Sequence, residues 1–213
     1  MPTVNQVERA IKALRGFEAP KVPLEQYATD AHLASRMMVL LEDEYQALED
    51  LVVADLGCGS GVLTFAASLF SPLAIFAVDI DPDALHVFVS NKELFSNSGY
   101  EAEFIEPILG DVLRFPNFFR GRVDTVISNP PFGTKNNAGV DVEFVKVGLR
   151  TGEQVFSLHK TSTRNFLERK VGGKAIASLG FDIPNQFSFH KKKNATVEVD
   201  LVHFEAPIKV SGI

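Results

Sequence analysis

The sequence predicts an α/β fold, in which a seven-stranded and mostly parallel sheet ends in an antiparallel hairpin. Three observations indicate this fold. Short apolar runs alternate with helical patterns along most of the 213 residues. A loop with three glycines joins the first of these runs to a helical segment, as in a βαβ unit. The last two apolar runs are separated only by a short basic turn, which is typical of a hairpin.

The elements follow in chain order. Apolar residues at helical spacing, from Val4 to Leu14, predict a short amphipathic N-terminal helix. Further helices are predicted at 31–41, 62–69 and 84–94. Continuous apolar runs are typical of parallel strands that helices cover on both faces. They predict strands at 52–55, 75–79, 102–105, 123–128 and 154–159, with the hairpin strands at 185–190 and 196–204. The chain is therefore expected to be one domain, 1–213, with a short tail at 207–213.

The glycine loop predicts a ligand site at the end of the first strand. Asp55 closes that strand, and Gly57, Gly59 and Gly61 follow it. Glycines let the backbone approach a ligand closely, and the exposed amides at the helix start suit an anionic or strongly polar group such as a carboxylate. A dinucleotide fingerprint would need glycine at position 62, where this chain has Val62. The loop therefore favours a different ligand.

Acidic residues close the next two predicted strands. Asp79 lies 18 positions after Gly61 and is placed to bind the hydroxyls of a ribose. We interpret Asp81, which precedes Pro82, as a helix cap. Asp111 follows the third strand, where it could accept a hydrogen bond from the amine of a bound adenine. The alternative interpretation of Asp111 is another helix cap.

The tetrapeptide Asn129-Pro130-Pro131-Phe132 ends the fourth predicted strand and is the most informative motif. An exocyclic amine or a carboxamide attacks a methyl donor poorly while its lone pair is delocalised. The Asn129 side chain and the Pro130 carbonyl can each accept one hydrogen of that amine and orient its nitrogen. Pro131 stiffens the segment, and Phe132 offers a face on which a flat base can stack. The alternative interpretation is a simple turn, since Asn and Pro are common turn residues.

Composition excludes several other functions. The single cysteine, Cys58, rules out an internal disulfide or a cysteine zinc cluster, and we interpret it as a small filler between two glycines. The five histidines show no metal-ligand spacing, so we expect no metal. No apolar run is long enough for a signal peptide or a membrane span, and we expect localisation in the cytoplasm, the nucleus or both.

The net charge of −6 means that binding to a nucleic acid would require a local basic patch. The candidates are expected near the end of the sheet that carries the catalytic strand, and their alternative interpretation is ordinary solvated loop charge. They are Lys135, Lys160, Arg164, His190, Lys191, Lys192 and Lys193.

Several segments resemble the methyltransferase-like protein 5 family along nearly the whole chain. They are the stretches 24–29, 55–63, 79–81, 129–137, 157–160 and 189–193. The resemblance implies a Rossmann-like class I methyltransferase that uses S-adenosyl-L-methionine. It further implies N6-methylation of an adenosine in small-subunit (18S) ribosomal RNA. Two departures from the family are Ser60, where relatives carry a second cysteine, and a short glycine-bearing connection between Val171 and Phe181.

The resemblance also assigns residues and a partner. The loop within 1–30 would fold over the donor, and the alternative interpretation is that Thr29 or Asp30 is only the cap of the following helix. The donor would be bound at Gln26, Thr29, Gly57, Ser60, Val62, Asp79, Asp111 and Val112, beside the loop residues Asp55, Gly59 and Gly61. The implied partner is a small zinc-binding methyltransferase activator subunit, the transfer RNA methyltransferase subunit 11-2 homolog. It would cover an apolar surface and pair with the edge strand near 102–105, which is flanked by Phe70, Phe76, Phe88, Phe95 and Phe104. The alternative interpretation is that most of these phenylalanines belong to the core.

Other functions compete with RNA adenine methylation. The same clamp suits the carboxamide of a protein glutamine, although Phe132 in place of a tyrosine and the basic candidates disfavour an N5-glutamine methyltransferase. Methylation of DNA adenine would require base flipping, and the chain has no evident target-recognition domain. A catalytically silent, donor-binding RNA scaffold is the non-enzymatic alternative, and the intact Asn129 and Asp79 argue against it.

Overall fold

A seven-stranded sheet runs through the part of the chain that the computed structural model describes, residues 1–114, 123–133, 137–184 and 194–206. The strands are β1 (Val52–Leu56), β2 (Ala74–Asp79), β3 (Ile105–Leu109), β4 (Val123–Ser128), β5 (Gly152–Lys160), β6 (Lys174–Pro184) and β7 (Asn194–Glu205). Their order in the sheet is β3-β2-β1-β4-β5-β7-β6. The first five in this order are parallel, and β7 is antiparallel to both β5 and β6. The predicted mostly parallel sheet with a C-terminal antiparallel pair is therefore confirmed.

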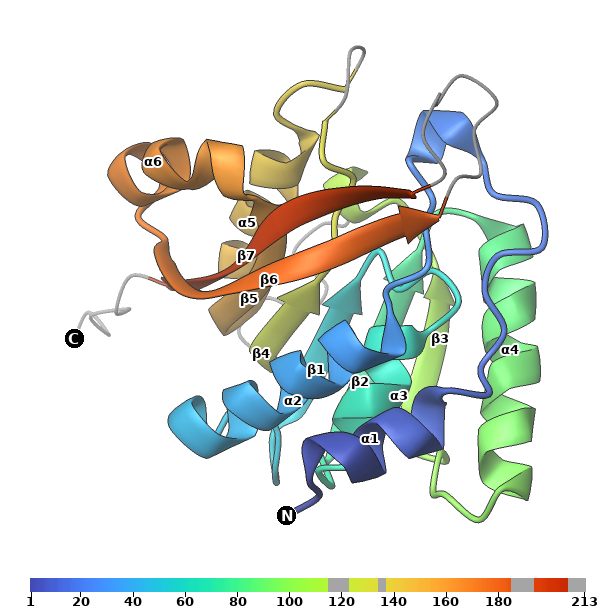
Figure 1. The fold of residues 1–213 in the computed structure, drawn as a ribbon. Helices are drawn as coiled ribbons and strands as arrows, with labels where there is room; N and C mark the ends of the chain where they lie inside the picture. The colour runs from blue at the N-terminus through green and yellow to red at the C-terminus, as the bar shows by residue number, and fades with distance from the viewer. Residues whose placement is uncertain (115–122, 134–136, 185–193, 207–213) are drawn as a thin grey trace.

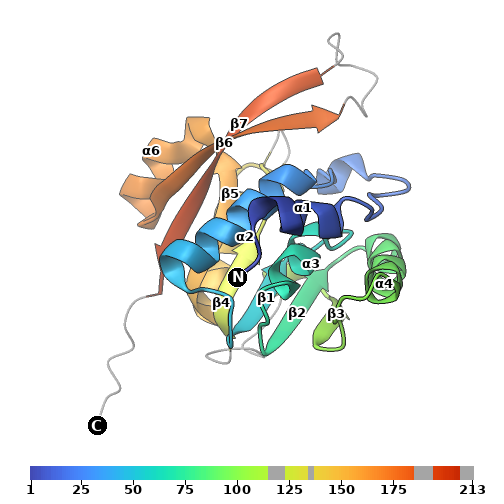
Figure 2. The same ribbon diagram turned by 60° about the horizontal axis from the view of Figure 1, so that its bottom comes forward.

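Helices cover both faces of the sheet (Figures 1 and 2). The α-helices are α1 (Val4–Ile11), α2 (Ala31–Tyr45), α3 (Val62–Ser68), α4 (Pro82–Asn97), α5 (Val140–Thr151) and α6 (Arg164–Phe166). Short turns of helix are η1 (Val22–Leu24), η2 (Val112–Arg114), η4 (Thr161–Thr163) and the π-helical turn η5 (Leu167–Val171). The predicted helices are confirmed with shifts of a few residues at their ends.

Two hydrophobic cores lie on opposite faces of the sheet, because successive strand residues point to opposite sides. Val53 of β1 belongs to the larger core, which contains buried side chains of α1 to α4 such as Phe65 and Phe88. The next residue, Ala54, belongs to the smaller core with Val145 of α5. Strands covered on both faces explain the continuous apolar runs in the sequence.

Two strands differ from their predicted positions. The strand expected at 102–105 begins only at Ile105 and continues through Pro107, which an edge strand tolerates because one side of it makes no ladder hydrogen bonds. The first hairpin strand was expected at 185–190, which lies outside the described residues. β6 instead occupies 174–184, so most of the segment between Val171 and Phe181 is a strand rather than a connection. Pairing with β7 determines this strand, since its own sequence contains Gly180 and a bulge near Ala175.

Among the described residues, no helix is both long and apolar enough to cross a membrane. The same residues contain no cluster of three or more His, Cys, Asp or Glu side chains that could hold a metal ion.

Candidate active site

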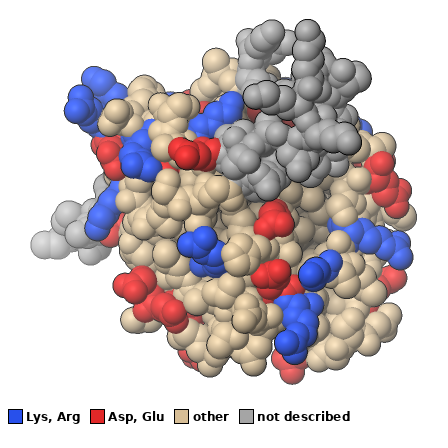
Figure 3. Space-filling view, viewed as in Figure 1, with Lys and Arg blue, Asp and Glu red and all other residues tan. Residues whose placement is uncertain are grey.

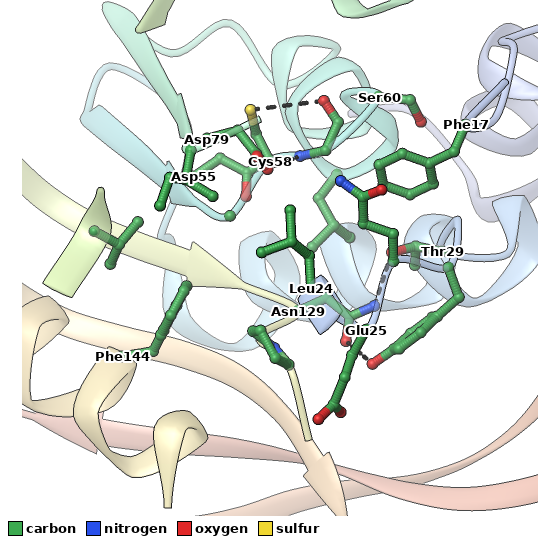
Figure 4. A pocket seen from close by; sticks show the side chains of 18 of the residues that line it. Phe17, Leu24, Glu25, Thr29, Asp55, Cys58, Ser60, Asp79, Asn129 and Phe144 are labelled. Carbon is green, nitrogen blue, oxygen red and sulfur yellow. Dashed lines mark hydrogen bonds between the residues drawn. The ribbon is translucent and has the colours of Figure 1, made fainter. Parts of the chain in front are cut away.

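A cavity of about 250 Å³ lies at the carboxyl ends of β1, β2, β3 and β4. Its lining comes from the loops after these strands, from Phe144 of α5, and from the strap, which we define as residues 17–29 between α1 and α2. Figure 4 shows Asp55 and Asp79 on one side of the cavity and Asn129 with Thr29 on another. Ligands of open α/β sheets bind at this edge, so the predicted residues converge where the fold places a site.

The glycine loop is held by the neighbouring strand and lies against an aromatic ring of the strap. The amides of Gly57 and Cys58 donate to the Val78 carbonyl of β2 at 2.8 and 3.0 Å. Gly59 has a φ of +55°, and a Cβ added there would lie 2.7 Å from the ring of Phe17. Any other residue would therefore strain the backbone and push this ring of the strap away from the loop.

Cys58 is buried and is a small filler in the loop, as predicted. Burial raises the pKa of its thiol well above the usual value, so the thiol keeps its proton.

Asp79 and Asp81 have different roles at the end of β2. The carboxylate of Asp79 accepts from the Gly59 amide at 2.8 Å and from the Asp81 amide at 2.9 Å. Burial is the main cause that raises its pKa. Asp81 caps α4 by accepting from the Asp83 amide, so the predicted cap is confirmed. Asp79 thus joins the glycine loop to β2 while it lines the cavity.

Asp55, which lines the cavity, has one carboxylate oxygen without a hydrogen-bond partner. One carboxylate oxygen accepts from the Thr64 hydroxyl at 2.6 Å, and the other is buried without a hydrogen-bond partner. Burial, opposed by the Thr64 hydrogen bond and assisted by the charge of Asp79, raises the pKa of Asp55 to about 7. A cationic ligand beside this oxygen would supply the missing partner.

The charge of the cavity tests which ligand the site suits. The described lining residues include Glu25, Asp55, Asp79 and Asp111 but no Lys, Arg or His. Such a lining disfavours a nucleotide phosphate and favours a ligand with positive charge. S-adenosyl-L-methionine carries an ammonium and a sulfonium group and a ribose, and the residues present fit it. The described residues that line the cavity include every predicted donor residue except Gly61, namely Gln26, Thr29, Asp55, Gly57, Gly59, Ser60, Val62, Asp79, Asp111 and Val112.

The strap is fastened to the donor side of the cavity. Gln26 donates to Asp81 at 2.7 Å and accepts from the Lys21 amide at 2.8 Å. The Lys21 ammonium lies 2.5 Å from Asp81 and 2.7 Å from Asp83. Gln26 lines the cavity, but these two contacts use both the nitrogen and the oxygen of its side-chain amide to hold the strap in place.

The strap also holds Asn129 at the acceptor side. The Asn129 amide donates to the Thr29 hydroxyl at 3.0 Å, and its carbonyl accepts from the Tyr27 hydroxyl at 3.3 Å. Asp30 is the cap of α2, because its side chain accepts from the amides of His32 and Leu33. Thr29 is therefore not the cap of this helix. Burial raises the pKa of Tyr27 well above its usual value, so this hydroxyl keeps its proton to donate. Tyr27 was not predicted, because nothing but its place beside Gln26 marks it in the sequence.

Phe132 lies between Tyr27 and Lys160. The ring centroids of Tyr27 and Phe132 are 5.4 Å apart, and the Lys160 ammonium is 5.7 Å from the Phe132 centroid. Lys160, at the end of β5, therefore joins the same group as the Asn-Pro-Pro-Phe motif.

Asp111 both lines the cavity and caps a turn. Its carboxylate accepts from the Leu113 amide at 2.9 Å at the start of η2, as its alternative interpretation predicted. Three further lining residues, Phe17, Leu113 and Phe144, are aromatic or apolar and carried no recognisable signal in the sequence.

The chain resembles known proteins along nearly its whole length. It is 37% identical to the rRNA N(6)-adenosine-methyltransferase METTL5 of Danio rerio, over 94% of this chain and 98% of the relative. It is 40% identical to the rRNA N(6)-adenosine-methyltransferase metl-5 of Caenorhabditis elegans, over 92% of this chain and 94% of the relative. The chain belongs to the rRNA N6-adenosine-methyltransferase family.

Two further comparisons support a methyltransferase fold for this chain. A solved Pyrococcus horikoshii structure, described as a candidate RNA methyltransferase, superposes with a TM-score of 0.80 at 32% identity and covers 96% of this chain and 98% of that one. The predicted Rossmann-like methyltransferase fold is therefore confirmed. Residues 27–129 also match the family model of the ribosomal protein L11 methyltransferase. That match contains the glycine loop and stops at Asn129, so it covers mainly the donor-binding half.

The structure describes two of the predicted basic residues, Lys160 and Arg164. Lys160 lies beside Phe132, as described above. The Arg164 guanidinium contacts both carboxylate oxygens of the buried Asp200, at 2.7 and 2.5 Å, so its charge is already paired. The other candidates, Lys135, His190, Lys191, Lys192 and Lys193, lie outside the described residues.

Proposed function

We propose that this protein transfers a methyl group from S-adenosyl-L-methionine to N6 of an adenosine in small-subunit (18S) ribosomal RNA. The observation that carries the proposal is the Asn129 carboxamide, held by Thr29 and Tyr27 at the edge of an acidic cavity and next to the exposed part of Phe132. Membership of the rRNA N6-adenosine-methyltransferase family supports the substrate class.

The acidic end of the cavity would hold the donor. Bound S-adenosyl-L-methionine supplies an electrophilic methyl group on a sulfonium centre. The unpaired oxygen of Asp55 is suited to an ammonium group, and Asp79 to ribose hydroxyls. Asp111, at the end of β3, is suited to accept from an adenine amine, with the apolar Val112 and Leu113 beside it.

The clamp would orient the acceptor. The Asn129 carbonyl and the Pro130 carbonyl each accept one hydrogen of the adenine amine, which withdraws the lone pair from the ring and directs it toward the cavity. The Phe132 ring offers a stacking face for the base. A methylated amine is cationic and acidic enough to release its proton to water, so no side chain has to act as a general base.

The glutamine alternative is weaker. The match to a protein methyltransferase model ends at Asn129, whereas the rRNA methyltransferase relatives align with more than nine-tenths of this chain. Phe132, in place of a tyrosine, also favours a base over a carboxamide.

The partner proposed for this chain is the small zinc-binding methyltransferase activator subunit. It would pair with β3, which is an edge strand of the sheet. Exposed apolar side chains lie on and near β3, namely Ile80, Leu109 and Leu113, which are 46 to 61% exposed. Of the five phenylalanines that flank this strand, Phe70, Phe88 and Phe95 are buried in the core, as their alternative interpretation predicted, and Phe76 and Phe104 are partly buried. We propose the cytoplasm, the nucleus or both as the location.

The proposal is tested by labelled methyl transfer to total RNA, purified DNA and protein extract, followed by nucleoside analysis. Label in N6-methyladenosine of small-subunit ribosomal RNA is the expected result. Label only in protein would mean that the clamp binds a glutamine carboxamide rather than an adenine. Asn129→Ala should lower kcat at least about 100-fold while donor affinity, measured by calorimetry, stays nearly unchanged. The exposed Asn97→Ala is the matched control, and loss of donor binding by Asn129→Ala would contradict its role as acceptor clamp.

A further inference from the structure

Phe166 is an aromatic side chain that the fold leaves in solvent. It ends α6, and it is 52% exposed, whereas the next residue, Leu167, is fully buried in the smaller core. Leu167 therefore anchors this helical turn, and the packing of the turn does not require an aromatic ring at position 166. The ring is therefore available to contact another molecule.

The segment that carries Phe166 starts at the active site. Lys160, whose ammonium lies near the Phe132 ring, is the last residue of β5 and precedes η4 directly. η4 runs into α6 without a break. Figure 1 shows α6 at the same end of the sheet as the segment that follows β4. Lys160, beside Phe132, and the exposed Phe166 thus lie six residues apart on one continuous segment.

The turn that follows the exposed ring carries one acid, Glu168, and two cations. Arg169 and Lys170 lie about one turn after Phe166, and both are exposed. Within the described part of the chain, neither forms an ion pair, in contrast to Arg164, which Asp200 neutralises. Figure 3 shows several Lys and Arg side chains over the region of α6, with Asp and Glu side chains among them. Free cations beside an exposed ring suit a polyanion with flat bases rather than an apolar protein surface.

We propose that Phe166, Arg169 and Lys170 form a docking surface for single-stranded RNA that flanks the target adenosine. Phe166 stacks on a base, and the two cations contact phosphates. This inference rests on the proposed function and deepens it, since it names where the substrate is held outside the catalytic clamp. In this segment it replaces Arg164, which was predicted to bind RNA but is paired with Asp200, by Arg169 and Lys170.

The test is the equilibrium binding of a labelled single-stranded RNA, with the target adenosine and its flanks, to the full chain at several salt concentrations. Phe166→Leu should weaken binding about tenfold with an unchanged salt slope, and Phe166→Tyr should retain binding, because it keeps the ring. The double variant Arg169→Ala/Lys170→Ala should lower the slope of log K against log salt by about 1.4, since each phosphate contact on a single strand contributes about 0.7.

Controls come from the opposite side of the fold. Leu73 is 62% exposed in the loop before β2, and Leu73→Ala should leave RNA affinity unchanged. Arg9 and Lys12, on and just after α1, provide the matched removal of two exposed cations. An equal change in salt slope for Arg9→Ala/Lys12→Ala would overturn the proposal, because the effect would then be general charge.

Failure of this inference differs from failure of the proposed function. If wild-type protein methylates ribosomal RNA but the Phe166 and Arg169/Lys170 variants retain its RNA affinity and KM, the docking surface is wrong and the function stands. If Phe166→Leu instead releases a bound protein without changing RNA affinity, the surface binds a protein and the inference is overturned. If wild-type protein binds the RNA through these residues but transfers no methyl group to it, only the proposed function fails.

Discussion

Replacement of Asp55 by asparagine should change the pH dependence of stability in the donor-free protein. The pKa of Asp55 rises from 3.8 to about 7 in the folded state, mainly because the side chain is fully buried. The folded state therefore binds more protons than the unfolded state between these two values. The contribution of Asp55 to stability is fully present below about pH 4 and is lost as the pH rises through 7.

The size of this effect follows from the shift. It is about three pKa units, and each unit corresponds to about 1.4 kcal/mol, so ionisation of Asp55 costs the folded state on the order of 4 kcal/mol at pH 8. Asparagine does not titrate and still offers an oxygen to the Thr64 hydroxyl. The free energy of unfolding of Asp55→Asn minus that of the wild type should therefore increase by about 4 kcal/mol from pH 4 to pH 8.

Urea denaturation of both proteins at several pH values measures this difference, and other titrating groups cancel in the subtraction. Asp43→Asn, at an exposed position of α2, is the control for the loss of one negative charge. S-adenosyl-L-methionine should reduce the difference at pH 8, because a cationic ligand favours ionised Asp55. A difference that stays constant within about 1 kcal/mol across the pH range would refute the argument that burial of Asp55 controls its ionisation.

The remaining predictions concern the strap and the glycine loop. Tyr27→Phe keeps the ring on Phe132 but removes the hydrogen bond to Asn129, so kcat should fall about 3- to 10-fold with donor affinity retained, as measured by steady-state kinetics and calorimetry. An unchanged kcat would show that Thr29 alone orients the amide. Gly59→Ala strains a positive φ and places a Cβ against a strap ring, so donor affinity should fall at least tenfold in calorimetry. Gly99→Ala has a φ of +89° with open space around it, and it should lose stability without losing donor affinity.

Residues at strand ends were predictable because their positions depend on local sequence. Each of Asp55, Asp79 and Asn129 follows an apolar run, and parallel strands bring such ends together at one edge of the sheet. The glycine loop was predictable for the same reason, since its positive φ values require glycine. Local rules were thus sufficient to find the chemical centre of the site.

The elements that were misplaced depend on distant pairing. β6 contains Gly180 and small or polar residues, and its strand conformation is set by its ladder with β7. β3 contains Pro107, which is allowed only because the strand lies at the edge. Tyr27 was missed for a similar reason, because its contact with Asn129 joins residues 102 positions apart. Sequence spacing carries no record of such contacts.

The strap connects the two halves of the proposed reaction. Through Gln26 it is fixed to Asp81, two residues after the carboxylate suited to the donor ribose, and through Thr29 it is fixed to Asn129. These contacts lie only three residues apart in the chain, so one short segment touches both the donor side of the cavity and the acceptor clamp. Tyr27 and Thr29 both belong to this segment and both contact Asn129, so the orientation of the carboxamide depends on the strap as well as on the loop after β4.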